Sequence, residues 1–140
     1  MKKFTLAQDK ERYEILGIEY DPKAFGGIVK FKDLDKEAFK KLLDKGYINK
    51  NDRQNFSPST AQFYKFMTNN DDFTAHGYLV INDRGDRRIS IEGLEYHGGI
   101  GHEVQHDINN WLEMLKEIDE DVEDPDEYSV YDDYIWMWWD

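Results

Sequence analysis

The feature that most constrains the fold is a pair of strand-like segments separated by a short polar turn. Residues 73–82, FTAHGYLVIN, form an apolar run, and residues 83–86, DRGD, have the composition of a turn. The segment that follows, RRISIEGLEY, alternates, with Ile89 and Ile91 on one face and polar side chains on the other. Two such segments around a turn predict an antiparallel β-hairpin. Gly93 marks an expected β-bulge within it.

Helical patterns precede the hairpin. Asp35 is a good N-cap for a helix over residues 36–45, which ends just before a glycine. Ser57 and Pro58 predict the N-cap and first residue of a second helix over residues 58–68. A shorter helix is expected over residues 9–16, and an additional strand over residues 28–31.

The longest predicted helix covers residues 102–118. Its apolar side chains recur at steps of three and four residues, which is the helical period. They are Val104, Ile108, Trp111, Leu115 and Ile118.

These elements predict a single α+β domain over residues 1–140, with an antiparallel sheet centred on the hairpin and about three helices. A chain of 140 residues is long enough for one hydrophobic core. The residues expected in that core are Phe39, Leu42, Leu43, Phe63, Phe66, Leu79, Ile81, Ile89, Ile91, Ile108, Trp111 and Leu115.

Several functional classes are excluded by composition. The chain contains no cysteine, so it has no disulfide, no thiolate nucleophile and no thiolate metal ligand. The first residues lack the long apolar segment of a signal peptide, and no stretch approaches the roughly 18 apolar residues of a membrane span. We therefore expect a cytoplasmic protein with no membrane partner.

The net charge of −12 is distributed unevenly. Residues 1–100 hold 17 basic and 16 acidic side chains and are nearly neutral. Residues 101–140 hold 14 acidic side chains and a single lysine. This asymmetry indicates a charged surface at the C-terminal end of the chain.

One motif resembles an enzyme family. His102, Glu103 and His106 have the H-E-x-x-H spacing of the zincin metalloproteases. The resemblance implies a zinc-dependent hydrolase in which both histidines bind the metal and Glu103 is the general base. However, at about 100° per residue both histidines point away from the apolar stripe of the predicted helix. His76 or His97 would have to supply a third ligand. A solvated helix face without metal or cofactor is the preferred interpretation.

A second pattern resembles a winged-helix domain. The helix over residues 36–45, the helix over residues 58–68 and the hairpin follow in the expected order, and arginines lie near the wing tip: Arg84, Arg87 and Arg88. A DNA-reading helix should carry several basic and amide side chains. The second helix offers chiefly Gln62 and Lys65, and the net negative charge repels phosphates. DNA binding or regulation is therefore an alternative only.

The acidic C-terminal third gives the preferred functional hypothesis. On an extended chain at about 3.3 Å per residue, its carboxylates repeat much like the phosphates of a nucleic-acid strand. The composition is similar to that of phage-borne inhibitors of restriction and CRISPR nucleases. This resemblance implies a non-enzymatic inhibitor or adaptor that docks on a basic nucleic-acid-binding protein and does not bind nucleic acid itself. The candidate partner-binding residues are Asp119, Glu120, Asp121, Glu123, Asp124, Asp126, Glu127, Tyr128, Tyr131, Asp132 and Asp133. A solvated, solubilising loop is the plainer alternative.

The chain ends in YIWMWWD. Five large apolar side chains in so short a segment would expose a sizeable patch if they stayed in water. We expect residues 135–139 to dock on the domain as a strand or short helix and to join its core.

Overall fold

The computed structural model describes residues 4–21, 23, 26–53, 57–69, 72–81, 87–97, 113, 125, 127–130 and 135–139, and the structural statements below concern these residues. The elements are α1 (Leu6–Leu16), β1 (Ile28–Leu34), α2 (Lys36–Asp44), α3 (Thr60–Asn69), β2 (Phe73–Ile81), β3 (Arg87–Tyr96), β4 (Glu127–Val130) and β5 (Ile135–Trp138).

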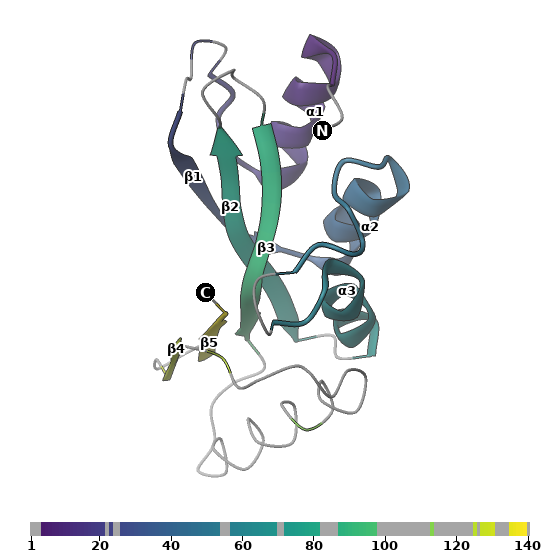
Figure 1. The fold of residues 1–140 in the computed structure, drawn as a ribbon. Helices are drawn as coiled ribbons and strands as arrows, with labels where there is room; N and C mark the ends of the chain where they lie inside the picture. The colour runs from purple at the N-terminus through teal and green to yellow at the C-terminus, as the bar shows by residue number, and fades with distance from the viewer. Residues whose placement is uncertain are drawn as a thin grey trace.

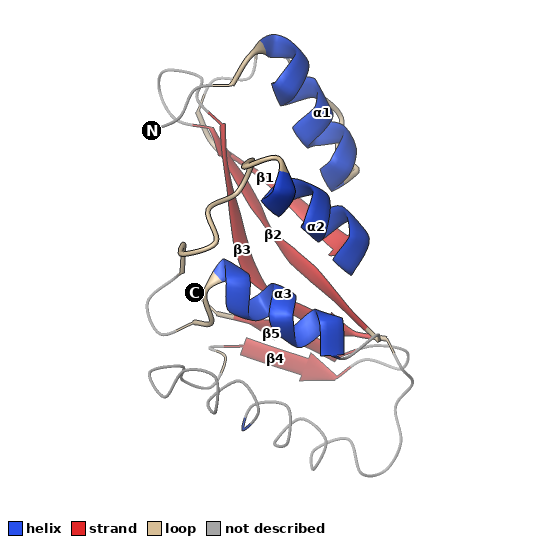
Figure 2. Ribbon diagram, turned by 90° about the vertical axis from the view of Figure 1, so that its right-hand side faces the viewer, coloured by secondary structure: helices blue, strands red, loops and turns tan. Residues whose placement is uncertain are grey.

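The strands form one five-stranded sheet in the order β1-β2-β3-β5-β4 (Figure 1). Every neighbouring pair is antiparallel. The helices α1, α2 and α3 lie along one face of the sheet (Figure 2). The predicted α+β fold with a hairpin-centred antiparallel sheet is therefore confirmed. None of the described helices has the length and apolarity needed to cross a membrane.

The hairpin of β2 and β3 has the predicted pairing and the predicted bulge. Its register runs from Phe73 opposite Tyr96 to Ile81 opposite Arg87. His76 pairs with Gly93 whereas the next residue of β2 pairs with Ile91, so one extra residue lies on β3 beside Gly93. A side chain at Gly93 has no room, because a Cβ there would approach the Met137 carbonyl oxygen to 1.9 Å.

Local hydrogen bonds explain where the helices begin. The side chain of Asp35 accepts a hydrogen bond from the amide of Ala38, as its predicted role of N-cap requires. Helix α1 begins earlier than predicted because Thr5 and Gln8 form a capping box. Gly17 ends α1 in the left-handed conformation, with a φ of 72°.

The predicted start of α3 at Ser57 and Pro58 is wrong. Helix α3 begins at Thr60, and the residue before it supplies the cap. The Ser59 hydroxyl accepts a hydrogen bond from the Gln62 amide at 3.3 Å, and the Gln62 side chain accepts one from the Ser59 amide at 2.6 Å. This reciprocal pair satisfies two backbone amides at the start of α3.

The core fills the space between the helices and the sheet. Of the predicted core residues, Leu43 is only partly buried, and eight are buried: Phe39, Leu42, Phe63, Phe66, Leu79, Ile81, Ile89 and Ile91. Ile108, Trp111 and Leu115 lie outside the described residues, as does the predicted helix over residues 102–118 apart from the exposed, helical Glu113. Further buried residues, not among the predicted ones, come from α1, β1 and the ends of the hairpin and include Tyr13, Leu16, Phe31, Leu34, Phe73 and Leu94.

The aromatic C-terminal segment docks as predicted. Residues of β5 pair with the end of β3, from Gly93 opposite Trp138 to Tyr96 opposite Ile135. Met137 is fully buried, and Trp139 is 2 % exposed. The Trp139 ring packs edge-on against Phe63 of α3, with the ring centroids 5.5 Å apart. The segment is thus part of the core.

Strand β4 was not predicted. Its four residues, Glu127–Val130, come from the acidic stretch and pair with β5. The acidic composition concealed the strand, because the usual signals of an apolar run or an apolar-polar alternation are weak over four residues. Backbone pairing with β5 stabilises the strand although these local signals are weak.

Candidate functional site

Polar and aromatic side chains gather on the face of the sheet that the helices leave open. Ala75, Leu94 and Met137 are paired across β2, β3 and β5 and belong to the helix-covered core. Successive side chains of a strand point to opposite faces. The next paired row, Thr74, Glu95 and Trp136, therefore lies on the open face.

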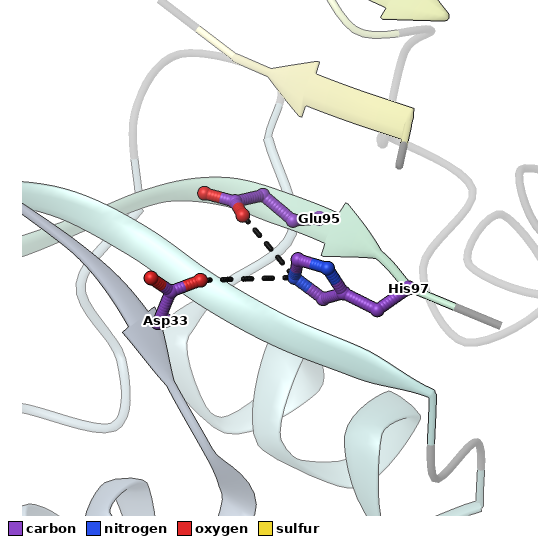
Figure 3. Close-up of side chains that lie close together, drawn as sticks. All are labelled: Asp33, Glu95 and His97. Atoms are coloured by element: carbon purple, nitrogen blue, oxygen red, sulfur yellow. Dashed lines mark ion pairs between the residues drawn. The ribbon is translucent and has the colours of Figure 1, made fainter. Parts of the chain in front are cut away.

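At one end of this face three side chains approach one another (Figure 3). Asp33 comes from β1, Glu95 from β3, and His97 directly follows β3. His97 Nε2 lies 3.2 Å from Glu95 Oε2 and 3.8 Å from Asp33 Oδ1. One ligand atom from each residue lies within 4.8 Å of the others, and no second group of this kind occurs in the described part of the chain.

The fold brings these residues together through a second irregularity, on β1. Phe31 pairs with Gly77 and Leu34 with Ala75, so β1 carries one extra residue between these two pairs. Asp33 lies in that interval and has a φ of 58°, in the left-handed region. Aspartate tolerates this conformation better than most residues.

Hydrogen bonds hold His97 in place. Its backbone amide donates to the carbonyl oxygen of Asp72 at 2.8 Å, which ties the residue after β3 to the residue before β2. The Thr74 hydroxyl lies 3.1 Å from the ring nitrogen Nε2. The same ring nitrogen thus faces a hydroxyl and two carboxylates.

The three side chains of the cluster differ in how far they are buried. Glu95 is 3 % exposed, whereas the side chains of Asp33 and His97 are 58 % and 38 % exposed. Burial raises the pKa of Glu95, the negative charge of Asp33 raises it further, and His97 lowers it. Glu95 Oε1 is buried and has no hydrogen-bond partner among the described residues. A carboxylate in this environment is costly to ionise unless a positive charge accompanies it.

A second histidine on the same face has a structural role. The ring of His76 stacks on Trp136 with centroids 3.6 Å apart and an interplanar angle of 15°. Its Nε2 donates to the Met137 carbonyl oxygen at 2.8 Å. Burial lowers the pKa of His76 to about 4, although backbone hydrogen bonds oppose the shift. His76 is therefore a neutral core residue that joins β2 to β5.

Most of the predicted site residues lie outside the described residues. This holds for the candidate partner-binding residues except Glu127 and Tyr128, which belong to β4 and whose backbone pairs with β5 opposite Trp138 and Met137. It holds also for the alternative zinc motif, His102, Glu103 and His106. The docking surface and the zinc motif therefore stay predictions.

Arg87 begins β3, beside the predicted wing tip, but its side chain is packed within the domain. Its side chain is 8 % exposed, and it donates hydrogen bonds to the Tyr13 hydroxyl at 2.9 Å and to the Asp21 carbonyl oxygen at 3.0 Å. The guanidinium is engaged within the domain, because α1 and the segment that follows it pack beside the start of β3. Arg84 lies outside the described residues, and Arg88 is exposed.

The cluster of Asp33, Glu95 and His97 was not predicted from the sequence. One signal was present: Glu95 and His97 are two residues apart at the end of a strand, which puts both on one face. The third member depends on the pairing of β1 with β2 and has no local signal. Searches of protein-family models, of curated proteins and of solved structures found no match to this chain.

Proposed function

We propose that the protein is a non-enzymatic interaction protein whose acidic C-terminal third docks on a basic, nucleic-acid-binding protein and acts as its inhibitor or adaptor. The observation that carries this proposal is the division of charge: 14 acidic side chains and one lysine over residues 101–140, against near neutrality over residues 1–100. Clustered charge of one sign steers a partner of opposite charge and favours its correct orientation.

The position of β4 supports the proposal. The acidic stretch leads into this strand, which is one of the two edge strands of the described sheet. Strand β5 connects β4 to the domain, and Met137 anchors it because its side chain is fully buried. An acidic segment attached to a rigid sheet loses less conformational entropy on binding than a free tail does.

The chemistry of the partner follows from the acidic segment. Seven carboxylates occur within the nine positions 119–127, and tyrosines follow them. A protein groove that binds a phosphate backbone through lysine and arginine accepts closely spaced negative charges. Tyrosines such as Tyr128 and Tyr131 are frequent anchors at interfaces. Nucleic acid itself is repelled by the same charges.

The test replaces five carboxylates and measures binding to a captured partner. A pull-down from host lysate at low salt identifies the partner, which must bind nucleic acid and be displaced by duplex DNA. Neutralisation then uses asparagine or glutamine at Asp119, Glu120, Asp121, Glu123 and Asp124. We expect binding to weaken at least about tenfold, or about 1.4 kcal/mol, mostly through a slower association rate.

A matched variant controls for net charge. It neutralises five exposed carboxylates of the near-neutral part: Glu14, Glu19, Glu37, Asp44 and Asp72. Both variants change the net charge equally, so only a docking surface predicts a selective loss in the first. Equal binding by the two variants would identify the acidic stretch as a solubilising surface.

A further inference from the structure

The cluster on the open face gathers two carboxylates and a hydroxyl around one ring nitrogen. His97 Nε2 faces Glu95 Oε2 at 3.2 Å, Thr74 Oγ1 at 3.1 Å and Asp33 Oδ1 at 3.8 Å. A ring nitrogen carries at most one hydrogen, which can be donated fully to one acceptor. A cation at the centre of the cluster would interact favourably with the ring nitrogen and both carboxylates.

The separations fit such an ion. For metal–ligand bonds of about 2.1 Å, neighbouring ligand atoms in tetrahedral or octahedral sites lie about 3.0–3.5 Å apart. The distances from His97 Nε2 to the two carboxylates are 3.2 and 3.8 Å, and the three ligand atoms lie within 4.8 Å of one another. We propose that Asp33, Glu95 and His97 form a binding site for a divalent transition-metal ion, with Zn²⁺ as the best-fitting ion.

The burial of Glu95 is an independent argument for a ligand. Its side chain is 3 % exposed, one of its oxygens, Oε2, faces His97 (Figure 3), and the other, Oε1, has no hydrogen-bond partner among the described residues. A buried acceptor without a partner costs about 1–3 kcal/mol, and more if it is charged. A cation bound through Oε2 would offset the negative charge that the carboxylate shares over both oxygens, and it would reduce the repulsion between Glu95 and Asp33.

The ligand types select the ion. One imidazole and two carboxylates suit borderline transition metals such as Zn²⁺, whereas Ca²⁺ and Mg²⁺ prefer oxygen ligands alone. The partial exposure of Asp33 and His97 gives the ion a path from solvent. Three protein ligands also leave at least one coordination position for water. The site uses residues of the near-neutral part of the chain, none of which belongs to the proposed docking surface.

The experiment measures Zn²⁺ binding by calorimetry and Co²⁺ binding by its visible absorption spectrum. The wild-type chain should bind one ion at this site, and Zn²⁺ should raise its melting temperature. The variants Glu95→Gln and His97→Gln should each weaken binding about 100-fold or more, since even the loss of a group behind a ligand costs about 10- to 100-fold. Asp33→Asn is the safest variant for folding, because its side chain is exposed and asparagine tolerates a positive φ.

The matched control is the double variant His102→Gln with His106→Gln, which removes the ligands of the H-E-x-x-H motif and leaves the cluster intact. It should bind Zn²⁺ like the wild type. Absence of Zn²⁺ binding by the wild-type chain would overturn the proposal, and so would unchanged affinity in Asp33→Asn and Glu95→Gln. Binding lost only in the double variant would assign the metal to the zincin-like motif, and it would count against the non-enzymatic function too.

Discussion

Burial of His76 should make the domain less stable as the pH falls. The pKa of this histidine falls from its ordinary value of 6.5 to about 4 in the folded protein. Between these values the unfolded chain binds a proton that the folded chain does not. The contribution of neutral His76 to the free energy of unfolding is therefore complete above pH 6.5 and is lost as the pH falls toward 4.

The magnitude follows from the two pKa values. For one proton, each pH unit in this window lowers the free energy of unfolding by about 1.4 kcal/mol. The fall from pH 6.5 to 4 therefore lowers it by about 3 kcal/mol. The physical reason is that burial deprives the charged ring of solvating water, which the hydrogen bond to the Met137 carbonyl oxygen offsets only in part. Glu95 acts in the opposite direction, because its pKa is raised and the folded form gains stability as the pH falls.

Comparison with a His76→Gln variant isolates the effect. Glutamine retains an amide donor for the Met137 carbonyl but does not titrate in this range. Urea unfolding followed by tryptophan fluorescence, at several pH values between about 7.5 and 4, gives the free energy of unfolding of both chains. The wild type should lose about 3 kcal/mol more than the variant over this range. Parallel pH profiles for the wild type and His76→Gln would refute the reasoning.

Three further changes test the packing of the open face and of the C-terminal segment. In metal-free protein near pH 7, Glu95→Gln should raise the melting temperature, because burial raises the pKa of Glu95 and disfavours its ionised form; a lower melting temperature would contradict this. Trp139→Ala should cost about 3–5 kcal/mol in the free energy of unfolding, because the ring is buried against Phe63; a loss below about 1 kcal/mol would show that the segment is not core. Gly93→Ala should destabilise the domain by more than about 1 kcal/mol, since its Cβ would meet the Met137 carbonyl oxygen at 1.9 Å; unchanged denaturation would mean that β5 shifts freely.

The elements that were predicted correctly are those whose signals lie within a single short stretch of residues. The alternation around Ile89 and Ile91 predicted β3, Asp35 predicted the start of α2, and the aromatic density of the last residues predicted a docked segment. Each of these signals acts within one element, through side-chain periodicity, capping or the cost of exposed apolar surface. The start of α3 was missed because Ser57 and Ser59 are both plausible caps, and only the partner at Gln62 decides between them.

The cluster on the open face depends on interactions between distant elements. Asp33 is 62 residues from Glu95 along the chain, and they meet because β1 and β3 both flank β2 and because β1 carries an extra residue. Neither the strand order nor the extra residue has a signal within one short window of sequence. Glu95 is buried although it lies on the face opposite the helices, because Thr74 of β2 and Trp136 of β5 flank it there.

The two proposals concern different residues and can fail separately. Zinc would bring two positive charges to Asp33 and Glu95, within the near-neutral first 100 residues, whereas docking would use the carboxylates of residues 119–133. Because exposed charges are largely screened at physiological salt, independence of the two sites predicts that neutralising five of those carboxylates changes Zn²⁺ affinity by less than about tenfold. Conversely, Asp33→Asn should abolish most Zn²⁺ binding and leave the association rate with a basic partner unchanged, because it alters the acidic surplus by a single charge. A change in the partner's association rate as large as that of the five-residue variant would instead show that the cluster lies within the docking surface.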